Sequence, residues 1–260
     1  MSETKASPLL VIGAGIAGVT AALEAAEMGS EVVLVEQDPA IGGRVLRINN
    51  YFPKLCPPSC GMEINTRRLE RNPRIRVMTS SKVTAAEKTD GGWAVTVTTA
   101  PAYVTAACTA CGDCEKACET TVPDPHNLGL CTAKAIRLPH LNAWPKRFVF
   151  DRDAVGDAEA KKIAEACAYG AVDLEATATT ETIEVGSVVV ANRATGKAVG
   201  MNIWDDVEAT TPANSVPGMV IMSGIVRSSK SINVAATISI TRTAWAKKIA
   251  VAAGWNPSTN

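Results

Sequence analysis

Residues 9–44 read LLVIGAGIAGVTAALEAAEMGSEVVLVEQDPAIGGR, and this stretch decides the fold. The apolar run Leu9–Ile12 has the length of a buried strand, and the alanine-rich residues 19–28 are typical of a helix. Residues 31–35 return to the composition of a strand. A strand, a glycine turn, a helix and a second strand form a complete βαβ unit, so we predict a three-layer α/β fold.

The turn between the first strand and the helix has the spacing G-x-G-x-x-G. Gly13 permits the tight turn, Gly15 lets a pyrophosphate approach the backbone, and Gly18 lets the helix pack closely on the strands. The phosphates would lie at the helix N-terminus, where free N–H groups and the dipole favour anions. Glu36, which follows the second strand, is placed to accept from a ribose hydroxyl and to repel a 2′-phosphate. The pattern predicts a dinucleotide site and disfavours NADP.

A second glycine signature, Ile41-Gly42-Gly43-Arg44, follows a few residues beyond Glu36. It resembles the turn that runs along the FAD pyrophosphate in flavoproteins with two dinucleotide-binding domains. Arg44 can pair with two phosphate oxygens at once, the alternative being a solvated surface arginine. We therefore expect FAD rather than NAD. The expected binding residues are Gly13, Gly15, Gly18, Glu36, Gly42, Gly43 and Arg44, and no catalytic side chain is assigned.

The composition of the 260 residues, 47% hydrophobic and 20% charged, is that of a globular protein. The net charge is zero and no long basic run occurs, so nothing favours nucleic acid or an anionic membrane surface. The N-terminal residues lack the apolar core of a signal peptide, and no apolar stretch is long enough to span a membrane. We expect a cytoplasmic protein, whose eight cysteines are metal or redox ligands before they are disulfides.

Cys108, Cys111, Cys114 and Cys118 form an uninterrupted C-x2-C-x2-C-x3-C run. Thiolates at this spacing wrap one iron-sulfur cube, because each short loop turns the next sulfur inward. Zinc sites usually draw their thiolates from two separated C-x2-C pairs, so zinc and inert cysteines are the weaker alternatives. The run predicts a 4Fe-4S cluster.

The fourth ligand of this cluster is open, because in two-cluster ferredoxins the fourth cysteine of such a run serves the other cluster. Residues around Cys167 read like the end of a second run. Counting back to its expected companions gives Ile163, Ala160 and Asp157, none of which is a cysteine. Either the four cysteines 108–118 act alone or, as we prefer, Cys118 is free and Cys167 replaces it. At most one cluster of the usual kind is supported.

Other residues carry weaker signals. Cys56 and Cys60 flank Pro57-Pro58-Ser59 in what reads as a stiff loop, and a redox or ligand role is the minority interpretation. A helix with a solvated arginine face is expected over residues 63–71, and a β-hairpin over residues 82–106 with its turn at residues 90–92.

Three further side chains receive no role from their surroundings in the sequence. Cys131 has no motif around it and is interpreted as a buried small hydrophobe. His126 and His140 have no neighbouring acid and no cysteine spacing, so surface or core histidines are expected.

Four segments together carry a family resemblance: GAGIAG at residues 13–18, the GGR loop, YFPKLC at residues 51–56, and CTACGDCEKAC at residues 108–118 with the following PHNLG and AIRLPH. The chain resembles the flavin-containing A subunit of heterodisulfide reductase and, more closely, the A subunit of the quinone-interacting membrane-bound oxidoreductase of sulfate-reducing microbes. The resemblance covers about residues 8–190.

The resemblance implies an FAD and iron-sulfur electron-transfer subunit, cytoplasmic and attached to the membrane only through partner subunits. In the quinone-linked branch, adenylylsulfate reductase is the soluble partner and menaquinone the membrane pool. The implied domains are a Rossmann-type FAD-binding part with a β-meander (1–105), a ferredoxin-like insert (106–176), and a return to the sheet with an atypical tail (177–260). Family members continue well beyond this length, so a shortened paralogue or a disturbed copy is expected.

Two rivals belong to other functional classes. A stand-alone flavin enzyme that oxidises a small molecule would not need the cysteine run. A non-catalytic assembly subunit would bind its cofactors only for structure. The absence of a recognisable acid/base dyad or nucleophile suits an electron carrier. The atypical C-terminal tail keeps the assembly subunit as an alternative.

Overall fold

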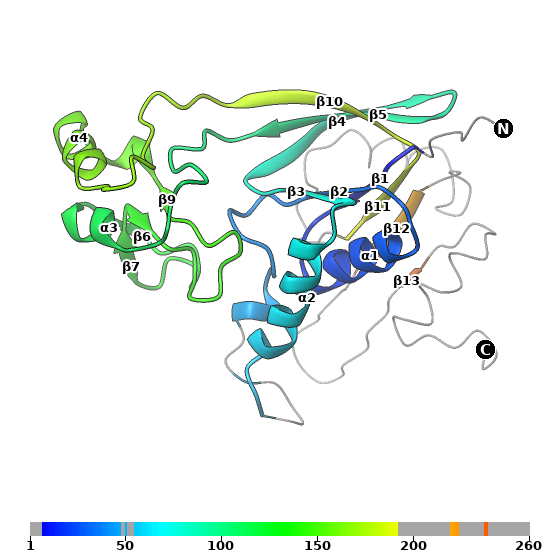
Figure 1. The fold of residues 1–260 in the computed structure, drawn as a ribbon, viewed down its shortest axis with the longest axis horizontal. Helices are drawn as coiled ribbons and strands as arrows, with labels where there is room; N and C mark the ends of the chain where they lie inside the picture. Colours follow the sequence, from blue (N-terminus) through cyan, green and yellow to red (C-terminus); the bar gives the residue numbers. More distant parts are fainter. Residues whose placement is uncertain (1–6, 48–49, 51–54, 192–218, 224–236, 239–260) are drawn as a thin grey trace.

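The computed structural model describes residues 7–47, 50, 55–191, 219–223 and 237–238. Its main sheet has the order β13-β12-β11-β1-β2-β3 (Figure 1). The strands are β1 (Leu9–Ile12), β2 (Val32–Val35), β3 (Ile75–Met78), β11 (Ser187–Val190), β12 (Met219–Ser223) and β13 (Thr237–Ile238). All neighbours pair in parallel except β12 and β13. The predicted α/β fold with a parallel sheet is confirmed.

The two faces of β1 and β2 enter different cores, because side chains alternate across a strand. Leu9, Val11 and Leu34 pack under two helices, α1 (Ile16–Glu27) and α2 (Ser59–Arg71). Leu10 and Ile12 pack on the opposite face against an antiparallel sheet. Both strands are therefore buried on both sides, which explains their unbroken apolar composition.

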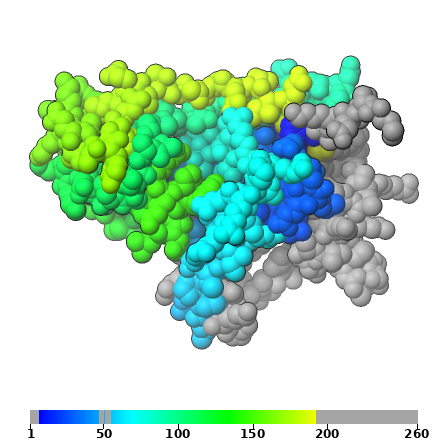
Figure 2. Space-filling view, in the orientation of Figure 1, coloured from blue at the N-terminus to red at the C-terminus, as the bar shows by residue number. Residues whose placement is uncertain are grey.

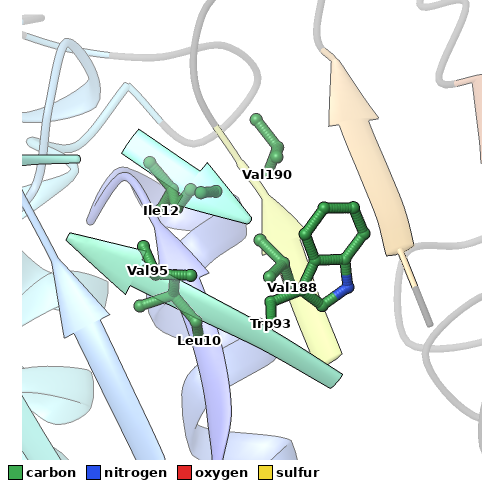
Figure 3. A pocket seen from close by; sticks show the side chains of 7 residues that line it. Leu10, Ile12, Trp93, Val95, Val188 and Val190 are labelled. Atoms are coloured by element: carbon green, nitrogen blue, oxygen red, sulfur yellow. The ribbon is translucent and has the colours of Figure 1, made fainter. Parts of the chain in front are cut away.

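The antiparallel sheet has the order β10-β5-β4 and consists of β4 (Ser81–Thr89), β5 (Gly92–Thr99) and β10 (Thr179–Val185). β4 and β5 form the expected hairpin, which turns at residues 90–91. Trp93 and Val95 of this sheet face Leu10 and Val188 of the main sheet (Figure 3). The cavity that these side chains line has a volume of about 10 Å³, which is too small for a cofactor.

Residues 103–174 build a third core away from the main sheet, seen at the left of Figures 1 and 2. Its elements are α3 (Asp113–Ala117), α4 (Asp157–Glu165), the strand pairs β6 (Thr121–Pro123) with β7 (Thr132–Lys134) and β8 (Ile136–Arg137) with β9 (Val149–Phe150), and the 3-10 turn Arg152–Ala154. Phe150 packs edge-on against Tyr103, with ring centroids 6.2 Å apart. Cys114 and Cys118 belong to this core, and Cys108 packs against it.

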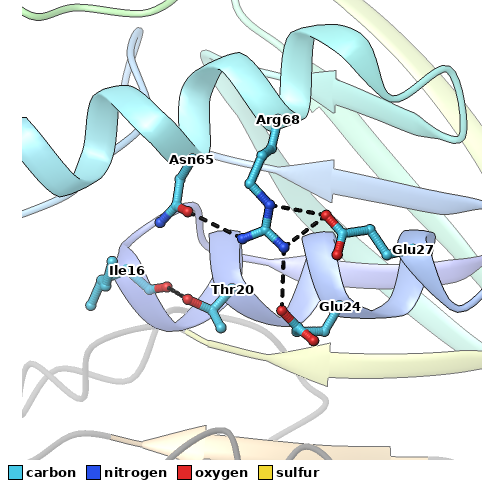
Figure 4. Close-up of polar contacts among 6 residues, drawn as sticks. All are labelled: Ile16, Thr20, Glu24, Glu27, Asn65 and Arg68. Atoms are coloured by element: carbon cyan, nitrogen blue, oxygen red, sulfur yellow. Dashed lines mark hydrogen bonds and ion pairs between the residues drawn. The ribbon is translucent and has the colours of Figure 1, made fainter.

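Helix α2 begins at Ser59 and not at residue 63, so Cys60 lies in its first turn and the expected stiff loop is shorter. Its Arg68 also departs from the expected solvated arginine face. The guanidinium contacts Glu27 at 2.7 Å and Glu24 at 3.4 Å, both on α1 (Figure 4). Arg68 therefore ties α2 to α1.

No helix in the described part of the chain is long and apolar enough to cross a membrane. The displaced family turn at residues 194–196 and the short helix expected over residues 245–255 lie outside the described residues.

Candidate functional site

The first glycine loop joins β1 to α1 and fits a phosphate-binding turn. Gly13 has φ 97°, a left-handed conformation that favours glycine. A Cβ on Gly18 would lie 1.8 Å from the carbonyl oxygen of Gly13, so only glycine permits this helix to sit against the loop. A Cβ on Gly15 would meet nothing within 4 Å, and no side chain caps the helix that starts there. The helix N-terminus is thus open to an anion.

The second glycine loop lies directly on the first. The amide of Gly42 donates to the carbonyl oxygen of Ala14 at 2.8 Å. A Cβ on Gly43 would lie 3.2 Å from the Cα of Gly15. Both Gly42 and Gly43 have positive φ, 111° and 56°. The two loops therefore form one backbone cradle, beside which Arg44 is exposed.

Glu36 is 8% exposed, and its carboxylate is hydrogen-bonded to the first glycine loop. One oxygen accepts from the amide of Ala14 at 2.6 Å, and the other accepts from the amide of Asp38 at 3.0 Å. Burial raises the pKa of Glu36, and the two amide hydrogen bonds counteract part of that rise. A carboxylate has about four lone-pair sites, so this one retains acceptors for a ribose hydroxyl.

The cysteine-bearing segments are joined through backbone pairing. Thr105 donates to the carbonyl oxygen of Ala171 at 2.9 Å, and Asp173 donates to that of Tyr103 at 2.9 Å. Positive φ values at Ala110 and Gly112, 56° and 90°, turn the chain sharply between the first three cysteines of the run. The last segment of the region is thereby held next to the start of the cysteine run.

Thiols in this region accept backbone hydrogen bonds. The amide of Ala110 donates to Cys108 Sγ at 3.4 Å, and the amide of Ala171 donates to Cys167 Sγ at 3.3 Å. Burial, together with smaller contributions from the charges of Cys108, Cys167 and Cys111, raises the pKa of Cys114 to about 11. Sulfurs that accept amide N–H groups are suitable ligands for an iron-sulfur cluster.

The chemistry of the donor set fits an iron-sulfur cluster, because the cysteine run and Cys167 supply only thiols. In the described residues, no three side chains of His, Cys, Asp or Glu converge closely enough to hold one metal ion. A 4Fe-4S cube takes one thiolate on each of its four irons, so its ligands surround a larger object.

Glu159 on α4 is a residue that the sequence analysis missed. Its carboxylate accepts from the amide of Glu119 at 2.6 Å, from the amide of Thr120 at 2.9 Å and from the Thr120 hydroxyl at 2.7 Å. These hydrogen bonds, led by those from Thr120, lower the pKa of Glu159 to about 2. No local pattern indicates this contact, because its partners are some forty positions earlier in the chain.

The interpretation of Cys131 as a buried hydrophobe is wrong. Its side chain is exposed, and its sulfur accepts from the Asn127 amide at 2.7 Å and contacts Asp124 at 3.7 Å. Hydrogen bonds to Asp124 close the loop between β6 and β7. Cys131 lies on the surface of this loop and not in a core. His126 stacks on His140 with ring centroids 5.6 Å apart, a pairing that the sequence did not indicate.

Comparison with known families supports the flavin assignment. A model described as FAD dependent oxidoreductase matches residues 8–47. The chain is 34% identical over 193 residues to the A subunit of the ferredoxin:CoB-CoM heterodisulfide reductase of Methanosarcina acetivorans, covering 72% of this chain and 24% of that protein. It is 33% identical over 189 residues to the iron-sulfur A subunit of the CoB--CoM heterodisulfide reductase of Methanocaldococcus jannaschii, covering 70% of this chain and 28% of that protein.

The expected resemblance to the A subunit of heterodisulfide reductase and to FAD-dependent oxidoreductases is confirmed. The chain spans about a quarter of the length of these relatives. Among solved structures, an oxidoreductase from Agrobacterium tumefaciens is 24% identical with a TM-score of 0.29, over 35% of this chain and 30% of that one.

Proposed function

We propose, from the relationship of this chain to the A subunit of heterodisulfide reductase, that it binds FAD and a 4Fe-4S cluster and transfers electrons between them within a larger complex. FAD would lie on the cradle of Gly13, Gly15, Gly18, Gly42 and Gly43, with Glu36 at the ribose and Arg44 at the phosphates. Cys108, Cys111 and Cys114 would hold the cluster, with Cys118 or Cys167 as the fourth ligand.

One observation carries the proposal: the second glycine loop is hydrogen-bonded both to the first glycine loop and to the cysteine-bearing region. Gly42 donates to Ala14 of the first loop, while Ile41 next to it donates to the carbonyl oxygen of Trp144 at 3.0 Å. Trp144 belongs to the segment between the cysteine run and Cys167, and its indole donates to Glu70 of α2 at 2.5 Å. Arg147 of the same segment donates to Thr79 at 3.2 Å. The cysteine-bearing region is thus fastened to the flavin cradle itself.

The chain's own residues bind, orient and tune the two groups. When bound, FAD would take up two electrons in all and could pass them one at a time to the cluster, which carries single electrons. The glycine backbone and the start of α1 would hold the pyrophosphate, while the amides of Ala110 and Ala171 donate to sulfurs and would stabilise the more reduced charge state. An electron relay requires no proton-transferring triad, so the proposal assigns no catalytic side chain.

The physiological setting follows from the resemblance noted in the sequence. We place the chain in a respiratory complex of sulfate reduction, between a soluble partner such as adenylylsulfate reductase and membrane quinone. It would be cytoplasmic and peripheral, held at the membrane by other subunits. The functional division is that expected above, with the flavin part over residues 1–105, the ferredoxin-like insert over 106–176, and the return to the sheet over 177–260.

The test is anaerobic purification of the full chain, followed by its absorption spectrum, iron and acid-labile sulfide content, and EPR after dithionite reduction. We expect a flavin spectrum, about four irons per chain and a fast-relaxing S = 1/2 signal. Flavin without iron would overturn the relay in favour of a small-molecule oxidoreductase. The absence of both groups would overturn the proposal as a whole.

A further inference from the structure

We infer that Cys167 is the fourth ligand of the cluster and that Cys118 is a non-ligating thiol in a second, closed lobe of the insert. The inference rests on the proposed cluster and concerns which thiols hold it. It assigns one cluster, and no more, to the region of residues 106–176.

The first step is the position of Cys167 relative to Cys108. Val104 and Val172 form an antiparallel bridge, flanked by the hydrogen bonds that Thr105 and Asp173 donate across it. In an antiparallel pair, moving forward along one segment matches moving backward along the other. Cys108 follows Val104 by four positions and Cys167 precedes Val172 by five, so both leave the bridge on the same side.

The second step concerns the thiols themselves. Cys108 and Cys167 are both half-buried, and Cys108 packs against the core of the insert. Cys167 Sγ also receives the amide of Ala171, as Cys108 Sγ receives the amide of Ala110. The sulfurs of Cys108 and Cys167 thus each accept a backbone N–H group, as is expected of cluster ligands.

The third step is the different environment of Cys118. It is 1% exposed, and its thiol donates to the carbonyl oxygen of Thr120 at 3.4 Å. A carbonyl oxygen beside this sulfur would repel the charge of a ligating thiolate, whereas the amide N–H groups beside Cys108 and Cys167 would stabilise that charge. Cys118 is a small apolar side chain in the core of the insert.

The fourth step is the space that a second cluster would need. In two-cluster ferredoxins the fourth cysteine of the run serves that second cluster. Here the companion positions counted back from Cys167 include Ala160 and Ile163 on α4, both fully buried in the same core as Cys118. Glu159, on the same helix, holds the backbone that follows Cys118 through Glu119 and Thr120. The space where a second cluster would lie is therefore filled by the side chains of Ala160 and Ile163 and closed by the hydrogen bonds of Glu159.

The test is a matched pair of variants of the full chain, Cys118→Ser and Cys167→Ser, purified without oxygen. Serine is close in size to cysteine, and a hydroxyl at position 118 can still donate to Thr120. We expect Cys118→Ser to keep about four irons per chain and the wild-type EPR signal. Cys167→Ser should lose the cluster or retain a three-iron form, recognised by EPR of the oxidised protein.

Flavin content and far-UV circular dichroism are measured on both variants to show that the fold persists. Loss of the cluster in Cys118→Ser with flavin retained would overturn the inference, and so would full iron content in Cys167→Ser. About eight irons in the wild type would overturn the closed second lobe. A wild type without iron would instead overturn the proposed function, so the two failures are distinguishable.

Discussion

The flavin cradle and the cysteine-bearing region are constructed in opposite ways. Every backbone contact between the two glycine loops is made within residues 9–44, where strand, turn and helix follow one another. The cysteine site depends instead on the pairing of residues 103–105 with residues 171–173. A site built from neighbouring residues can be predicted from sequence, and one added atom at its backbone can destroy it. A site assembled from distant segments depends instead on the core that brings those segments together.

The largest expected effect comes from Gly18→Ala, which tests the local site. The added methyl would overlap the carbonyl oxygen of Gly13 and also press on Ala191. We expect a cost of about 5 kcal/mol or more, enough to prevent stable folding. Urea denaturation of flavin-free protein, followed by circular dichroism, gives the measurement.

Gly15→Ala is the control for this prediction, because a methyl there meets nothing within 4 Å. Its cost to flavin-free stability should stay within about 1 kcal/mol, while flavin affinity falls because the methyl occupies the phosphate side of the loop. If Gly15→Ala binds flavin as the wild type does, the pyrophosphate does not lie on this loop.

Phe150→Ala should damage the assembled site while leaving the local one intact. It removes a buried ring that packs edge-on against Tyr103, beside the bridge at Val104. A cost of about 3 to 4 kcal/mol to the insert is expected, with loss of iron and retention of flavin. Leu34→Ala, in the buried centre of the main sheet, should reverse this order and release flavin first. Simultaneous loss of both groups in both variants would show a single cooperative unit.

Glu36→Gln should weaken flavin binding about tenfold, since one carboxylate acceptor is replaced by an amide donor. Burial raises the folded-state pKa of Glu36 above its ordinary value of 4.5. The folded state then binds more protons than the unfolded state between the two pKa values, so flavin-free stability falls as the pH rises through that window. The variant should lack this part of the pH dependence in urea titrations, and an unchanged slope would contradict the assignment.

The smallest effect is expected for Glu159→Gln. The folded-state pKa near 2 lies below the ordinary value of 4.5, so the stabilisation is fully present above that value and is lost as the pH falls toward 2. The variant should melt slightly earlier than the wild type at neutral pH, and the difference should disappear in acid. A difference that persists at low pH would mean that the hydrogen bonds do not depend on the carboxylate charge.

The success of sequence reasoning follows the same division between the two regions. The first two strands of the main sheet, the hairpin turn and the cradle glycines were accessible because each depends on neighbours within a few positions. Strands β12 and β13 of the same sheet were not predicted. The clamp of Glu159, the stacking of His126 on His140 and the exposure of Cys131 depend on distant segments and were missed or wrong. Helix α2 began four residues early because Pro58 is compatible with a helix start, which the prediction had treated as loop.

The pairing of Leu9 with Ser187 has a consequence for the order of biosynthesis. β1 is synthesised near the start of the chain, but its neighbour β11 emerges only after the whole cysteine-bearing region. During translation β1 has one edge unpaired, and the segment that packs beside Gly18 at Ala191 does not yet exist. The insert can therefore fold, and receive the proposed cluster, while the main sheet that surrounds it in sequence is still open. Until β11 arrives, that open edge is exposed to wrong pairing.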